Sequence, residues 1–137
     1  MPEIIPNYHP FMVHFTIALV VVSFLMCVLC YFFQFKPAIQ QECLIVSRWS
    51  IWLAAIFSIL TLIAGFHAYY SVAHDALSHQ VMIQHRNWGI VTFIFVWFLA
   101  IWSFISYRKQ KAINWLYTLC LAAMVGLVMI TGWHGGE

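Results

Sequence analysis

Long apolar runs separated by short polar segments make up most of this chain. The runs extend over Phe11–Phe35, Trp49–Tyr70, Trp88–Tyr107 and Ile113–Trp133. Each run is close to the roughly 20 residues that a helix needs to cross the hydrocarbon core of a bilayer. None alternates strictly between apolar and polar residues, as a membrane β-strand would, and backbone groups in hydrocarbon must bond within the segment. The pattern therefore predicts four transmembrane helices.

The polar segments between the runs are short, so consecutive helices are expected to be antiparallel neighbours. Ala122 and Gly126 have the small-xxx-small spacing that lets two membrane helices approach closely. We therefore predict one all-α domain over residues 1–137, an integral membrane four-helix bundle with an up-down-up-down arrangement.

The composition excludes several other classes of protein. Of 137 residues, 64% are hydrophobic, 18% aromatic and only 7% charged, whereas a soluble domain carries about 25% charged residues. The net charge is only +2 and no run of basic residues is present, so the sequence does not indicate a binding surface for nucleic acid. The abundance of apolar and aromatic residues excludes disorder. We therefore expect this chain to be surrounded by membrane lipid.

The distribution of positive charge predicts the orientation in the membrane. Most cations flank the first and third connections, and Arg86 alone lies on the other side. Those flanking the connections are Lys36, Arg48, Arg108, Lys109 and Lys111. By the positive-inside rule, both termini should face away from the cytoplasm. Because no Lys or Arg precedes Lys36, a signal peptide is not indicated, and we expect the first helix to remain in the mature protein.

The seven histidines are the strongest functional signal, because the predicted topology gathers all of them at the non-cytoplasmic end. They are His9, His14, His67, His74, His79, His85 and His134. Neutral imidazole binds iron, copper or zinc, and two histidines facing each other across a bundle can hold a haem from both faces. Hydration or ordinary hydrogen bonding at the interface is the structural alternative.

A haem site is the first hypothesis for these histidines. His14 and His67 lie about one helical turn inside the predicted interface. We select His14 and His85 as the axial pair, with His67 and His134 as a second pair or as a replacement for either, because spacing does not choose among them. Arg86 could pair with a haem propionate or anchor the helix at the interface.

A bare metal ion is the second hypothesis. His79, Met82 and His85 form one stripe if the third helix starts early. A thioether among imidazoles, with His74 close in the sequence, would suit copper. Asp75, next to His74, could orient an imidazole.

The cysteines carry a weaker signal. Cys27 and Cys30 have the Cys-x-x-Cys spacing but no following histidine, so the covalent haem signature is absent. We interpret them, with Cys43 and Cys120, as small buried apolar residues. No nucleophile elbow or phosphate loop is present in the sequence.

The start of the chain resembles the signature of a bacterial family of small membrane proteins, domain of unknown function 2231. Residues 9–10 read His-Pro and residues 13–17 read Val-His-Phe-Thr-Ile, where family members typically read Val-His-Phe-Pro-Ile. Gly65, His85 and a closing Gly-x-x-Gly-Gly at residues 132–136 also match. Thr16 departs from the usual proline.

The resemblance implies that His9, His14 and His85 are the histidines that go with this fold. It also implies a multi-pass protein of the bacterial inner membrane, similar in architecture to a small cytochrome b. His67, His74, His79 and His134 lie outside the family pattern, so we expect that they add ligands.

Three functions remain open from the sequence. The first is a cytochrome b-like protein that binds one or two b-type haems and transfers electrons to a redox partner protein or a quinone. The second is a membrane protein that binds copper or another transition metal. The third is a non-catalytic accessory subunit of a larger membrane complex or homo-oligomer.

Overall fold

Four helices make up the described part of the chain. The computed structural model describes residues 8–71, 75–112 and 114–136. In these ranges it contains α1 (His9–Phe32), α2 (Pro37–Ser71), α3 (Ala76–Arg108) and α4 (Trp115–Gly136), and no strand. All four helices are long and apolar enough to cross a membrane. The predicted all-α class with four membrane helices is confirmed.

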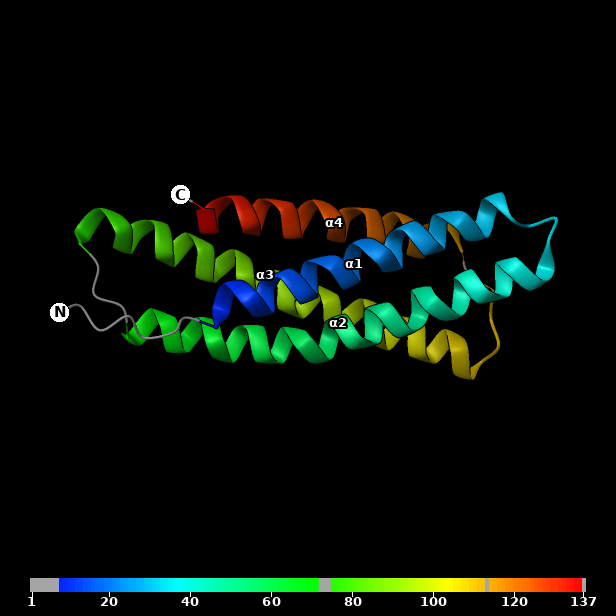
Figure 1. Ribbon diagram of the computed structural model, residues 1–137, viewed down its shortest axis with the longest axis horizontal. Helices are drawn as coiled ribbons and strands as arrows, with labels where there is room; N and C mark the ends of the chain where they lie inside the picture. The colour runs from blue at the N-terminus through cyan, green and yellow to red at the C-terminus, as the bar shows by residue number, and fades with distance from the viewer. Residues whose placement is uncertain (1–7, 72–74, 113, 137) are drawn as a thin grey trace.

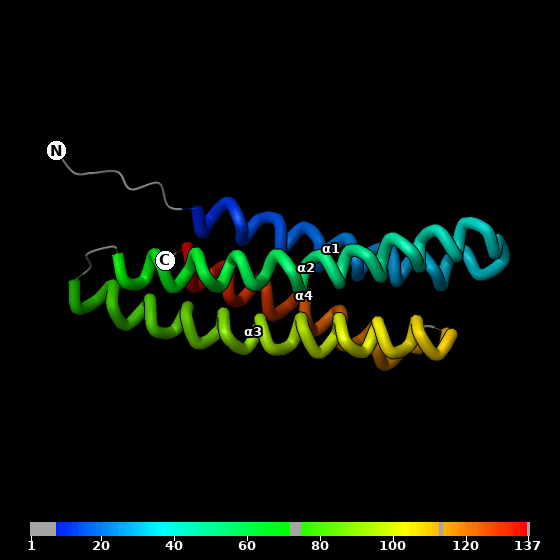
Figure 2. Tube along the Cα trace, turned by 90° about the horizontal axis from the view of Figure 1, so that it is seen from below, coloured from blue at the N-terminus to red at the C-terminus, as the bar shows by residue number. Residues whose placement is uncertain are grey.

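The helices run up and down in an elongated bundle (Figure 1). Each helix packs against its neighbours in sequence, and α4 closes the ring against α1. Over the described residues, the diagonal pairs α1–α3 and α2–α4 are not in backbone contact. The start of α1 and the end of α4 lie at one end of the bundle, which we call the terminal end (Figure 2). The other end, with the α1–α2 and α3–α4 connections, is the hairpin end.

The predicted starts of the second and third helices are too late. The second helix begins at Pro37 rather than Trp49, and the third begins at Ala76 rather than Trp88. Proline is well suited to the first turn of a helix, and Asp75 caps α3 by accepting a hydrogen bond from the Ser78 amide at 2.8 Å. The apolar run marks the part of a helix that crosses hydrocarbon, whereas backbone hydrogen bonding continues the helix into polar sequence.

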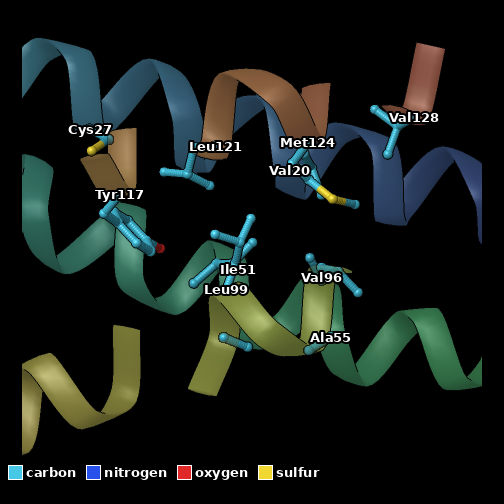
Figure 3. Packing of buried hydrophobic residues seen from close by; sticks show 12 residues of the cluster. Val20, Cys27, Ile51, Ala55, Val96, Leu99, Tyr117, Leu121, Met124 and Val128 are labelled. Carbon is cyan, nitrogen blue, oxygen red and sulfur yellow. The ribbon is translucent and has the colours of Figure 1, made fainter. Parts of the chain in front are cut away.

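The core lies in the middle of the bundle and draws on all four helices. Val20, Ile51, Leu99, Leu121 and Met124 are fully buried there (Figure 3). Large apolar side chains also cover much of the outer surface, as expected where lipid is the solvent. This packing fixes the helices that carry polar groups toward the two ends.

Two buried serines fasten α1 to α2. The Ser23 hydroxyl donates to the Ser47 carbonyl at 2.8 Å, and the Ser47 hydroxyl donates to the Ser23 carbonyl at 2.8 Å. Small residues therefore do bring helices together, as they commonly do in membranes. At Gly126 the predicted close approach is absent, because a Cβ added there would meet nothing within 4 Å.

Candidate functional site

Two histidines meet at the terminal end of the bundle. His9 is the first residue of α1 and His85 lies on α3, and their Nε2 atoms are 3.4 Å apart. The ring centroids are 5.7 Å apart and the ring planes are at 80°. The distance between the ring centroids exceeds the distance between the two Nε2 atoms by about two imidazole ring radii. The two Nε2 atoms therefore lie almost on the line that joins the ring centres and point at each other. The pair thus joins two helices that have no backbone contact.

The other nitrogen of each ring is held by a backbone carbonyl. His9 Nδ1 lies 3.1 Å from the Thr61 carbonyl oxygen, and His85 Nδ1 lies 3.0 Å from the Thr131 carbonyl oxygen. A carbonyl only accepts hydrogen bonds, so each Nδ1 must carry a proton and donate it. In a neutral ring the Nε2 atom then presents a lone pair. Two lone pairs directed at each other repel, and a proton or a metal ion between them would relieve this repulsion.

A glycine lies against the edge of each ring. A Cβ added at Gly65 would be 3.0 Å from His9 Cε1, and one added at Gly135 would be 2.8 Å from His85 Cε1. Both distances are shorter than ordinary carbon contacts of about 3.5–4.0 Å. The absence of a side chain at these positions therefore allows each ring to lie directly on the backbone of the next helix.

The same set of residues occurs once in each helical hairpin. The set is His9, Thr16, Thr61 and Gly65 in α1–α2, and His85, Thr92, Thr131 and Gly135 in α3–α4. The hydroxyls of the first threonine pair are 3.0 Å apart and those of the second pair are 2.8 Å apart. The two hairpins also run in the same direction, as repeats related by an axis along the membrane normal do. The histidine pair lies where the two halves meet.

A cavity of about 150 Å³ adjoins the histidine pair and is lined by all four helices. Most of its wall is apolar, with Phe66, Phe93 and Val96 among the contributors. Met82 and Arg86 also line it. The site is therefore an apolar chamber with two imidazoles, one thioether and one guanidinium in its wall.

The structure pairs His85 with His9 and not with the predicted His14. His14 is exposed, and its Nδ1 is hydrogen-bonded to the Pro10 carbonyl of its own helix. Its position follows from the helix turn, because five residues rotate a side chain by about 140° around the axis. His14 therefore faces away from the side that His9 presents to the bundle.

The other predicted ligands lie apart from the pair. His67 and His79 are exposed. His134 stacks on Trp88, with ring centroids 6.3 Å apart and planes at 11°. His74 lies outside the described residues. Within the part of the chain that the structure describes, no three His, Cys, Asp or Glu residues come together to hold a metal ion.

Arg86 has a position compatible with either predicted role. It lines the cavity, and its guanidinium carbon lies 5.5 Å from the centre of the Tyr69 ring. This cation–π contact holds the charge near the histidine pair. Met82 shares the cavity with His85, although exposed His79 does not complete the predicted copper stripe.

Sequence reasoning missed the pairing of His9 with His85 and the repeat behind it. The available signal was the spacing, because a histidine is followed seven residues later by a threonine in both α1 and α3. A threonine followed four residues later by a glycine likewise occurs near the ends of α2 and α4. Matching these two spacings would have identified the pair.

Comparison with known proteins bears on the family alone. Neither a curated protein nor a solved structure matches the chain. The family model described as predicted membrane protein (DUF2231) matches residues 6–137, which include all four helices and both members of the histidine pair. The resemblance found in the sequence is thus confirmed. The chain belongs to the DUF2231 family of predicted membrane proteins.

Proposed function

We propose that the protein holds a redox-active metal centre between His9 and His85 and serves as a small cytochrome b-like electron carrier. The observation that carries this proposal is the opposition of the two Nε2 atoms at 3.4 Å. Each Nδ1 is hydrogen-bonded to a carbonyl, and metal-bound histidines commonly have this outer partner. The carbonyls fix the tautomer and direct the lone pairs toward one point.

The alignment of the two rings favours haem iron. His9 and His85 would give a metal ion only two nitrogen donors, and iron would need further donors. The described residues offer no third His, Cys, Asp or Glu close to the pair, whereas a porphyrin supplies four nitrogens itself. The haem would provide a one-electron iron couple, and the chain would provide the axial ligands, an apolar surrounding and a cation at Arg86 for a propionate.

The fit of a haem depends on separation of α1 from α3. Two metal–imidazole bonds of about 2.0 Å require about 4 Å between the nitrogens, compared with 3.4 Å here. Gly65 and Gly135 hold the rings against α2 and α4, so neither ring can retreat by itself. The helices themselves would have to part, and α1 and α3 have no direct backbone contact that such a movement would break.

A bare copper ion is the second candidate, and the size of the cavity favours it. The cavity volume of about 150 Å³ is similar to that of a cavity that accepts benzene. A porphyrin is much larger than benzene and would not fit in this space. Copper binds imidazole and thioether ligands, and Met82 lines the same cavity as the histidine pair. This alternative uses the same two histidines.

The charge distribution supports an orientation with the histidine pair on the non-cytoplasmic side of a bacterial inner membrane. Five of the six Lys and Arg residues belong to the hairpin end. They are Lys36, Arg48, Arg108, Lys109 and Lys111. Positive charge accumulates on the cytoplasmic side of such proteins, which puts the terminal end on the opposite side.

The decisive experiment is a visible absorption spectrum of protein purified in detergent from haem-replete cells, recorded before and after dithionite. We expect reduced-minus-oxidised haem bands, and we expect His9→Ala and His85→Ala each to abolish them. His14→Ala is the matched control, because it removes a histidine from the same helix and should retain the spectrum. Elemental analysis of the same samples measures iron and copper.

The outcomes separate the candidates. A colourless protein with stoichiometric copper that is lost in both pair variants supports the second candidate. A protein with neither metal, or one whose metal content is unaffected by His9→Ala and His85→Ala, overturns the proposal.

A further inference from the structure

A hollow at the hairpin end brings three cations together. Arg48 of α2, Arg108 of α3 and Lys111 after α3 line a space of about 540 Å³ between the two helices. No Asp or Glu contributes to this lining. The positive-inside rule accounts for cations at this end, but it does not account for three of them converging on one acid-free hollow.

The hollow continues into an apolar groove. A neighbouring space of about 960 Å³ shares Arg48 and Tyr107 with it and extends past Trp49 and Phe104. The wall of this groove also contains no Asp or Glu. Cations at its mouth and aromatic side chains along its length suit a ligand with an anionic end and an apolar remainder.

Arg48 is held in place at the junction of the two spaces. Its guanidinium carbon lies 5.2 Å from the centre of the Tyr107 ring, within the range of a cation–π contact. Trp52 also lines the groove, but its indole nitrogen is buried inside the protein. A ligand with an oxygen-rich, anionic end could accept hydrogen bonds from the Arg48 guanidinium, whereas a purely hydrocarbon ligand could not.

We propose that this hollow is a binding site for an anionic phospholipid, with the phosphate headgroup at Arg48, Arg108 and Lys111 and an acyl chain along the groove between α2 and α3. Basic pockets between transmembrane helices bind such headgroups. The apolar continuation favours a lipid over a free phosphate ion. This site is at the opposite end of the bundle from the histidine pair and does not depend on it.

Native mass spectrometry of the full chain in detergent tests the proposal with two added lipids, phosphatidylglycerol and phosphatidylethanolamine. We expect the anionic lipid to be retained preferentially. Each cation near an anionic headgroup contributes about fivefold in affinity, so Arg48→Gln and Lys111→Gln should each lower retention of phosphatidylglycerol by about that factor. Arg48→Lys should preserve most of it, which separates loss of charge from loss of folding.

Lys36→Gln is the matched control, because Lys36 is exposed at the same end and lines neither space. It should leave lipid retention unchanged. Equal retention of the two lipids, or equal losses in Lys36→Gln and Arg48→Gln, overturns the site. An excess of inorganic phosphate should not displace the lipid, and displacement would instead indicate a small-anion site and overturn the lipid assignment.

Discussion

Replacing Gly135 by alanine should push His85 out of its position. The added methyl carbon would be 2.8 Å from His85 Cε1 and 3.1 Å from Nδ1, whereas carbon atoms in contact are normally about 3.5–4.0 Å apart. The ring must therefore shift by about 0.7 Å or more. The hydrogen bond from His85 Nδ1 to the Thr131 carbonyl is 3.0 Å long, and a shift of this size away from α4 would lengthen it beyond the ordinary range.

The expected magnitude follows from two opposing effects. Forcing a methyl group into an occupied space costs about 1–3 kcal/mol, and alanine is better than glycine in a helix by about 1 kcal/mol. Gly126→Ala offers a matched comparison, because its Cβ would meet nothing within 4 Å and only the helix preference applies. Gly135→Ala should therefore be about 1–3 kcal/mol less stable than Gly126→Ala. Loss of the carbonyl partner should also weaken the proposed metal binding about 10–100-fold.

Thermal unfolding in detergent, together with metal content, measures both effects. Gly65→Ala should lie between the two variants in stability, because its Cβ would be 3.0 Å from His9 Cε1 rather than 2.8 Å from a ring carbon. If Gly135→Ala unfolds at the same temperature as Gly126→Ala and retains its metal, the close packing of His85 on α4 is refuted. The stability measurement remains informative even if the protein binds no metal.

Two further predictions test the site and the packing. Protons compete with the proposed metal for the Nε2 atoms of His9 and His85, so metal content should fall as the pH is lowered, and a metal content that stays flat would contradict ligation by these two residues. Ser47→Ala should destabilise the protein by about 0.5–1.5 kcal/mol in thermal unfolding, because it removes a buried hydrogen bond to Ser23. The control is Ser71→Ala, which changes an exposed serine and should have no measurable effect. Equal stability of the two variants would argue against the serine contact.

The number and type of helices were predictable because hydrocarbon imposes a simple requirement. Each span must be apolar over about 20 residues and must bond its own backbone, and four runs in the sequence satisfy both conditions. The helix starts were less predictable. Pro37 and Asp75 begin helices within polar sequence, and the apolar pattern contains no information about how far a helix extends outside the bilayer.

The apolar pattern of the first helix did not distinguish His9 from His14, because both belong to the same helix end. A soluble amphipathic helix reveals its inward face through its apolar stripe, but α1 is apolar on all sides. Depth along the helix favoured His14, whereas the repeated spacing from histidine to threonine, which the prediction did not use, favours His9. Rotation about the helix axis decides the matter instead, and it directs His9 toward His85.

The duplicated hairpin has a consequence for how a bound group would be oriented. Two identical hairpins would offer a ligand two indistinguishable ways of binding, turned by half a revolution. The two halves of this chain differ, however, because the residue after the histidine is Pro10 in the first half and Arg86 in the second. An anionic group on a ligand would bind on the side of Arg86. An asymmetric ligand would therefore bind in this nearly symmetric site in a single orientation.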